Sequence, residues 1–176
     1  MASDGRGTGP ILVLIGPPGA GKTKLARRVA RGLGVSFVDT DRRIVARFGP
    51  IADIFAEHGE AHFRVLEREQ VERALETDGV VVSLGGGAIL DPRTQADLRG
   101  RPVALIDVTA EAVEERITGE KRPLLAAGGV AAWSALVEAR RPLYEALATK
   151  RFDTSHRPMD DVAGDILAWL EQEETR

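Results

Sequence analysis

The stretch GPPGAGKT at residues 16–23 constrains this chain more than any other feature. It follows an apolar run, Ile11 to Ile15, and precedes a segment with helical periodicity, which is the setting of a phosphate-binding loop between a strand and a helix. Small residues let consecutive backbone N–H groups converge on an anion there, so a plain Gly/Pro turn is disfavoured. The lysine of this pattern reaches the β- and γ-phosphates and the hydroxyl faces Mg²⁺. The predicted ligands are ATP and Mg²⁺, and the candidate binding residues are Gly19, Ala20, Gly21, Lys22, Thr23 and Lys24.

Length and composition narrow the class of protein. The chain has 176 residues, which suits one domain, and its net charge of −3 disfavours a nucleic-acid or membrane partner. It has no cysteine, no signal-peptide core and no apolar run of membrane-spanning length, so we expect a cytoplasmic protein. We expect residues 1–9 to be a flexible segment and residues 10–176 to form the domain.

The order of apolar runs predicts the fold class. Five runs read as strands, at Ile11–Ile15, Val35–Val38, Val80–Leu84, Val103–Val108 and, more weakly, Arg151–Thr154. Segments with helical spacing lie between and after them, at Lys22–Leu33, Phe63–Leu75, Pro92–Leu98, Ala110–Ile117, Val130–Leu147 and Asp160–Gln172. Continuous apolar strands that alternate with helices indicate a parallel sheet covered on both faces. The sequence therefore predicts an α/β, three-layer P-loop sandwich with its ligands beyond the carboxyl ends of the strands.

Two stretches fit poorly as core elements. Ile51 to Arg64 follows a short helix and contains Gly59, and Gly119 to Gly129 is basic at one end and rich in glycine at the other. Small nucleotide-dependent kinases carry a substrate-binding insertion and a closing lid in such places, because water must be excluded until the acceptor is bound. We expect a substrate-binding region at about residues 41–70 and a lid at about 118–130. Ordinary surface connections are the alternative.

The second predicted strand ends in two carboxylates, Asp39 and Asp41, at the same sheet edge as the phosphate-binding loop. Asp39 is placed to hold Mg²⁺ through water, and Asp41 to accept a hydrogen bond from an acceptor hydroxyl. The alternative is that Thr40 or Asp41 only caps the following helix.

Glycines and arginines supply further candidates. Three consecutive glycines follow the third predicted strand, in Ser83 to Gly87, and allow a ligand to approach the backbone closely, although simple flexibility is the alternative. A guanidinium can hold a carboxylate by two parallel hydrogen bonds. By position, the candidates for binding the anions of substrate and nucleotide are Arg64, Arg122, Arg140 and Arg141.

Taken in order and with their spacing, the motifs GPPGAGKT, DTD, GEAHFR, SLGGG, KRPLL and RRPLY resemble the shikimate kinase family along nearly the whole chain. The resemblance implies a fold like that of nucleoside monophosphate kinases, with a sheet order of 2-3-1-4-5. It also implies transfer of the ATP γ-phosphoryl group to the 3-hydroxyl of shikimate, in the pathway to chorismate and the aromatic amino acids. The partners implied are shikimate and ATP, and we expect a monomer.

The resemblance also assigns roles to residues. It places Asp41, Arg64, Gly86 and Arg140 on the substrate, where the Arg-x-Pro-Leu-Tyr spacing selects Arg140 rather than Arg141. It places Arg122 on the phosphates from the lid, and Arg116 and Arg157 near the adenine. Lys22, Asp41 and Arg122 are then the catalytic candidates, and Thr23 and Asp39 the metal candidates.

Other functions are compatible with parts of the pattern. A kinase of a shikimate analogue keeps nearly all of these residues, whereas a gluconate kinase lacks the DTD and GGG segments in this form. A regulatory P-loop NTPase leaves the carboxylate-binding arginines unexplained.

Overall fold

A computed structural model describes residues 8–117 and 128–176. Its elements are, in chain order, β1 (Leu12–Ile15), α1 (Lys22–Leu33), β2 (Phe37–Asp39), α2 (Thr40–Phe48), α3 (Ile51–Leu75), β3 (Val81–Ser83), the 3-10 helix η1 (Ala88–Leu90), α4 (Pro92–Leu98), β4 (Val103–Asp107), α5 (Ala110–Ile117), α7 (Gly129–Leu147), β5 (Lys150–Asp153) and α8 (Met159–Glu174).

The sheet is parallel, and its order is β2-β3-β1-β4-β5. β1 is the central strand, because Val13 is paired with Val82 of β3 on one side and with Val103 of β4 on the other. All four residues of β1 and all five of β4 are buried, as expected for strands covered on both faces. The predicted fold class and strand order are confirmed.

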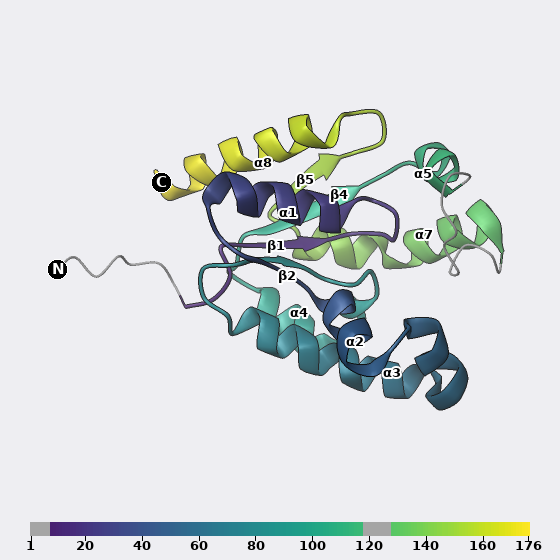
Figure 1. The fold of residues 1–176 in the computed structure, drawn as a ribbon. Coiled ribbons are helices and arrows are strands. Elements are labelled where there is room, and N and C mark those ends of the chain that lie inside the picture. Colours follow the sequence, from purple (N-terminus) through teal and green to yellow (C-terminus); the bar gives the residue numbers. More distant parts are fainter. Residues whose placement is uncertain (1–7, 118–127) are drawn as a thin grey trace.

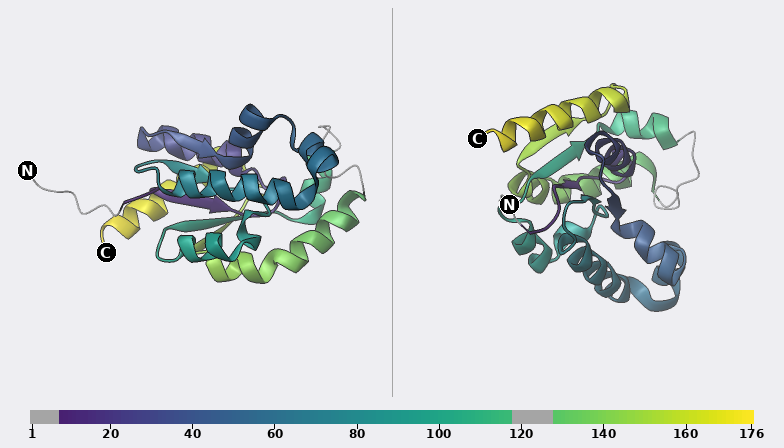
Figure 2. Two further views of the ribbon diagram at one scale, coloured as in Figure 1. Left: turned by 90° about the horizontal axis from the view of Figure 1, so that it is seen from below. Right: turned by 60° about the vertical axis from the view of Figure 1, so that its left-hand side comes forward.

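Helices cover both faces of the sheet, which gives three layers (Figures 1 and 2). Leu12 and Leu14 pack with α1 and α8 on one face, and the alternating residues Val13 and Ile15 pack with α3, α4 and α7 on the other. The strands are one or two residues shorter or displaced relative to the predicted runs, whereas α1, α4 and α5 have the predicted bounds.

The largest difference from the sequence prediction concerns α3. It begins at Ile51 rather than Phe63, and it is interrupted at Gly59, whose φ of 83° and ψ of 172° are not helical. Together, α2 and the first part of α3 form a lobe beyond the carboxyl ends of the strands (Figure 1). A small separate core of Ile44, Ile54 and Phe63 holds this lobe together. The stretch that fits the sandwich poorly is therefore a helical projection beside the sheet.

Two predicted segments fall partly outside the described residues. For the N-terminal segment, residues 1–7 are not described, but the Gly9 amide donates a hydrogen bond to the Asp78 carboxylate. For the predicted lid, residues 118–127 are not described, and Gly129 already begins α7. Within residues 8–117 and 128–176, no helix is both long and apolar enough to cross a membrane.

Candidate active site

The phosphate-binding loop joins β1 to α1 at the carboxyl end of the sheet. Gly19 and Gly21 have φ values of 82° and 92°, a region that only glycine enters without strain, and α1 begins immediately afterwards at Lys22. The buried Lys22 Nζ donates to the carbonyl oxygens of Gly16, at 2.7 Å, and Pro17, at 2.9 Å. The loop thus holds its cation close to its own backbone, at the start of a helix, where an anion is favoured.

Thr23 and Asp39 meet at the predicted metal position. The Thr23 hydroxyl donates to Asp39 Oδ2, and Asp39 Oδ1 accepts from the Arg42 amide at 3.0 Å. Asp39 is therefore the N-cap of α2. The alternative that Thr40 or Asp41 caps this helix is wrong, because neither residue has that role. Among the described residues, no group of three or more His, Asp or Glu side chains could hold a metal. Mg²⁺ needs few protein ligands when phosphates and water complete its octahedral coordination. The Thr23 hydroxyl and the Asp39 carboxylate therefore fit a site for Mg²⁺.

The four predicted substrate-binding residues line one cavity of about 180 Å³ beside the phosphate-binding loop. They are Asp41 from α2, Arg64 from α3, Gly86 after β3 and Arg140 from α7. The remaining lining residues are Pro18, Ile51, Phe55, Phe63, Glu67, Gly87, Ala132, Trp133 and Leu136. The cavity is therefore apolar on its walls, with a few convergent charged groups, as is typical of a small-molecule site.

The Asp41 carboxylate has hydrogen-bonding capacity that the described residues do not use. Its Oδ1 atom is buried and has no hydrogen-bond partner among the described residues. Burial raises the pKa of the Asp41 carboxyl and the nearby Asp39 raises it further, whereas Lys22 and Arg64 lower it. An unpaired buried carboxylate is costly in a folded protein unless a ligand uses it. Asp41 is thus available to accept a hydrogen bond from an acceptor hydroxyl.

Each of the three consecutive glycines lies against a different part of the site. A Cβ atom at Gly85 would lie 2.5 Å from Asp41 Oδ1, and one at Gly87 would lie 2.5 Å from Arg64 Nη1. A Cβ at Gly86 would lie 3.1 Å from Pro18 Cδ, in the phosphate-binding loop. Close packing, and not flexibility, therefore explains why this turn has no side chains.

Glu67 is a residue of the site that the sequence analysis missed. Its carboxylate accepts from Arg64 Nη1 at 2.7 Å, and its side chain is 6% exposed. Burial raises the pKa of Glu67, and the charges of Arg64 and Arg140 oppose this rise. The only sequence signal was its position three residues after Arg64, which places both on one helix face.

The two adjacent arginines of RRPLY face different surroundings. Arg140 lines the cavity, and its charge opposes the rise that burial causes in the pKa of Tyr144. Arg141 instead contacts Asp107 at 3.1 Å, on the side of α7 that faces β4. Tyr144, also missed from the sequence, donates to the Gly86 carbonyl at 2.6 Å, and burial raises its pKa.

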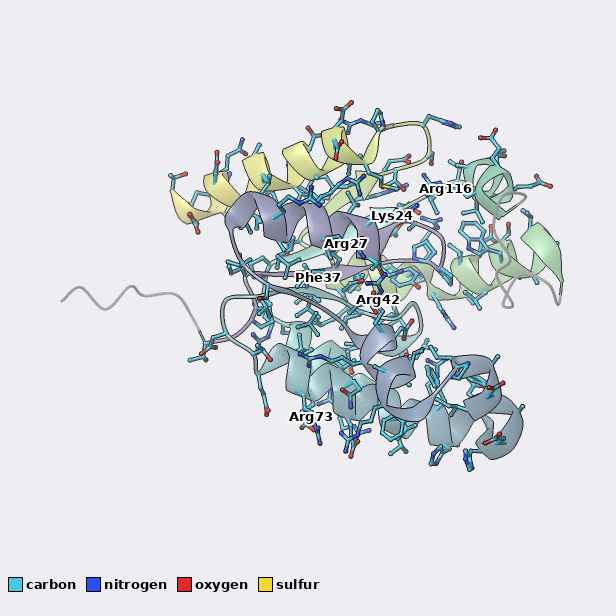
Figure 3. The ribbon with its side chains drawn as sticks, in the orientation of Figure 1. Lys24, Arg27, Phe37, Arg42, Arg73 and Arg116 are labelled. Carbon is cyan, nitrogen blue, oxygen red and sulfur yellow. The ribbon has the colours of Figure 1, made fainter. Side chains whose placement is uncertain are left out.

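The other residues predicted to bind the nucleotide lie in different surroundings. Arg116 Nη1 donates to the Gly19 carbonyl at 2.8 Å, and its other Nη atom donates to the Thr154 carbonyl, so it lies against the phosphate-binding loop. Lys24 is exposed on the first turn of α1. The side chains of Lys24 and Arg116 both lie toward the carboxyl ends of the strands (Figure 3). Arg157 is paired with Asp165 at 2.7 Å. Arg122 lies outside the described residues.

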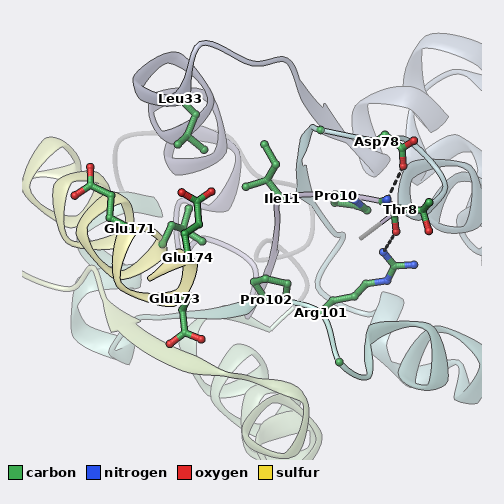
Figure 4. Close-up of a pocket in the computed structure, with 14 residues that line it drawn as sticks. Thr8, Pro10, Ile11, Leu33, Asp78, Arg101, Pro102, Glu171, Glu173 and Glu174 are labelled. Carbon is green, nitrogen blue, oxygen red and sulfur yellow. Dashed lines mark hydrogen bonds between the residues drawn. The ribbon is translucent and has the colours of Figure 1, made fainter. Parts of the chain in front are cut away.

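A larger cavity, of about 570 Å³, lies at the opposite, amino-terminal edge of the sheet (Figure 4). Its walls include Ile11, Leu33 and Leu170, with Glu171 and Glu174 at the rim. It contains none of the predicted site residues. Ligands of open α/β sheets bind beyond the carboxyl ends of the strands, so we assign the functional site to the smaller cavity.

The fold and this site define a class: a P-loop kinase that phosphorylates a small molecule held beside its phosphate-binding loop. A profile described as shikimate kinase matches residues 18–171. The shikimate kinase of Corynebacterium efficiens is 46% identical over 93% of this chain and 98% of its own, and that of Thermobifida fusca is 46% identical over 88% and 91%. The chain belongs to the shikimate kinase family.

Solved structures agree with this assignment. A shikimate kinase from Acinetobacter baumannii in complex with shikimate superposes with a TM-score of 0.88, at 29% identity, over 96% of both chains. A gluconokinase from Sinorhizobium meliloti reaches 0.64 at 19% identity, over 96% of this chain and 95% of its own, which shows a shared fold only.

Proposed function

We propose that this protein is an ATP-dependent kinase that transfers the γ-phosphoryl group to the 3-hydroxyl of shikimate, giving shikimate 3-phosphate and ADP in the pathway to chorismate. The observation that carries the proposal is the cavity in which Asp41, Arg64 and Arg140 converge beside Lys22 of the phosphate-binding loop. The similar structure from Acinetobacter baumannii contains shikimate, which supports the choice of acceptor.

The charges of the cavity suit an acceptor with one carboxylate and several hydroxyls. Arg64 and Arg140 come from different helices, both line the cavity, and the charge of each lowers the pKa of Glu67. A substrate carboxylate between them would receive charge-assisted hydrogen bonds in a partly desolvated site. Its hydroxyls would then face Asp41 on the loop side, which fixes the hydroxyl that meets the phosphate.

Phosphoryl transfer would then depend on positioning and on charge stabilisation. We propose that Asp41 accepts the hydrogen bond of the attacking hydroxyl, and that its raised pKa strengthens it as a proton acceptor. Lys22 would exchange the carbonyls of Gly16 and Pro17 for phosphate oxygens. When bound, Mg²⁺ would neutralise phosphate charge, held by Thr23 and, through water, by Asp39.

Further parts of the proposal rest on family membership. Arg122 would contact the phosphates, Arg116 and Arg157 would lie at the adenine, and Gly86 would contact the substrate. The backbone amides of residues 19–24 would receive the phosphates. We also propose a substrate-binding region at about 41–70, a lid at about 118–130, and a cytoplasmic monomer.

A coupled assay of ADP release tests the proposal. We expect release that requires shikimate, ATP and Mg²⁺ together. An analogue kinase would show a higher kcat/KM with another cyclic hydroxy acid in a substrate panel. A regulatory NTPase would release ADP at the same rate with and without shikimate, and this result would refute the proposal.

A further inference from the structure

Trp133 connects α7 to the phosphate-binding loop. The side chain is buried, and its indole Nε1 donates to the Pro18 carbonyl oxygen at 2.8 Å. It also lines the acceptor cavity together with Arg140. One indole therefore contacts the nucleotide loop with its polar atom while its ring forms part of the acceptor site.

The hydrogen bond to Pro18 has a consequence for the next residue, Gly19. The peptide unit is planar and trans, so the Pro18 C=O and the Gly19 N–H point in opposite directions within one plane. Gly19 has a φ of 82° and no side chain to oppose rotation of this peptide. By holding the carbonyl, Trp133 fixes the direction of an N–H group in the phosphate-binding loop.

Pro18 also contacts the acceptor side. Its ring packs on Gly86, where a Cβ would lie 3.1 Å from Pro18 Cδ, and Pro18 itself lines the acceptor cavity. Gly86 is held in turn from α7, because Tyr144 donates to its carbonyl at 2.6 Å. Trp133, Arg140 and Tyr144 are spaced by seven and four residues, which places them on one face of α7. This face contacts the nucleotide loop, the acceptor cavity and the glycine turn.

We propose that Trp133 is a positioning residue that couples the phosphate-binding loop to the acceptor cavity through Pro18. A nucleotide on the loop then increases the affinity of the cavity for the acceptor, and the acceptor increases the affinity for the nucleotide by the same factor. This coupling rests on the proposed function only for the two ligands, which are shikimate as acceptor and an adenine nucleotide on the loop.

The coupling can be measured as a thermodynamic cycle. The shikimate Kd is determined by calorimetry with and without Mg·ADP, in the wild type and in Trp133→Phe, which keeps an aromatic ring but removes the N–H. We expect ADP to tighten shikimate binding in the wild type. The ratio of the two Kd values should fall in Trp133→Phe by about 2- to 12-fold, the range that corresponds to one neutral hydrogen bond.

Trp169→Phe is the matched control. Trp169 is the only other tryptophan of the chain, and it is buried on α8 against Phe152, with 5.7 Å between ring centroids. It does not line the acceptor cavity. We expect this variant to keep the wild-type ratio of Kd values even if its melting temperature falls. An unchanged ratio in Trp133→Phe, or a wild-type ratio of 1, would overturn the proposal.

Fluorescence gives a second measurement that does not require the Trp133 variant to fold. In Trp169→Phe, all tryptophan emission comes from Trp133. We expect Mg·ADP alone to shift or quench this emission, because the nucleotide acts on the peptide that the indole holds. No change on saturation with Mg·ADP would contradict the coupling. Because this arm contains no shikimate, it stays informative even if shikimate fails to bind the wild type, which would count against the proposed function instead.

Discussion

Arg141, the next residue after the cavity-lining Arg140, forms an ion pair with Asp107 at 3.1 Å. Asp107 is 5% exposed, and Arg151 of β5 pairs with the same carboxylate oxygen at 2.6 Å. Residues that follow one another on a helix point in directions about 100° apart. The pairing with Asp107 therefore fixes the rotation of α7 that directs Arg140 into the acceptor cavity.

This arrangement predicts different effects for the two neighbouring arginines. Arg140→Ala should raise the shikimate KM and lower kcat/KM by roughly 10- to 150-fold, the worth of a hydrogen bond to a charged group, with little change for ATP. Arg141→Ala should act mainly on stability, by about 1 kcal/mol because the pair is partly exposed and Arg151 remains, or about 2–4 °C in melting temperature. Steady-state kinetics and thermal unfolding separate the two. The opposite pattern would mean that Arg141 is the substrate ligand.

Gly87→Ala tests the contact between the glycine turn and Arg64. The added Cβ would lie 2.5 to 2.9 Å from the Arg64 guanidinium, whose flexible end can move away without unfolding the protein. We expect a folded variant with a raised shikimate KM and a nearly unchanged ATP KM. Gly164→Ala is the control, because nothing lies within 4 Å of a Cβ there and its backbone is helical. Equal kinetics in both variants would show that Arg64 does not need this space.

The strand and helix order could be predicted because the local signals agree with the tertiary structure. α1 has the predicted bounds, since its apolar face and the C-terminal Gly34, with a φ of 69°, indicate the same helix. The start of α3 could not be predicted, because Gly59 interrupts the pattern and the apolar residues of this part pack in a small core of their own.

The residues of the site also divide into those that the sequence predicts and those that it does not. Lys22, Asp41 and Arg64 belong to recognisable motifs, and the structure brings them together. Trp133 and Tyr144 act through contacts with Pro18 and Gly86, which lie 115 and 58 positions away, and no local pattern encodes such pairs. They are also typical core or surface residues of helices, so their sequence positions alone favour a structural role.

Lys22→Ala should lower kcat by about 10³-fold or more, because it removes the loop cation that is proposed to neutralise charge on the transferred phosphoryl group. Lys22 is buried and donates to two loop carbonyls, so a small loss of stability is also expected. Circular dichroism establishes folding, and the ADP-release assay gives the rate. Lys24→Ala, at an exposed position on the same turn, should keep most of the activity. Near-normal turnover in a folded Lys22→Ala protein is incompatible with the role of the loop.

Asp39→Asn should raise the Mg²⁺ concentration needed for half-maximal rate, because a neutral amide attracts the cation and its bound water less strongly than a carboxylate does. It should also lower stability modestly, since Asp39 caps α2 and accepts from Thr23. Initial rates across a Mg²⁺ titration test this, with Asp41→Asn for comparison. If both variants show the same Mg²⁺ dependence, the two carboxylates act as one unit and have no separate roles.

Asp41→Asn should lower turnover and raise stability at neutral pH. Burial raises the folded-state pKa of Asp41 above its usual 3.8, so the folded protein binds the proton more tightly than the unfolded chain does. Stability from this group is therefore present below pH 3.8 and is lost as the pH rises through the folded pKa. The amide carries no charge at any pH, so the gain in melting temperature over the wild type should be largest above the folded pKa and should vanish toward pH 3.8. Thermal unfolding of both proteins across this range measures it, and a lower melting temperature of Asp41→Asn at pH 7 would show that a partner already stabilises the carboxylate.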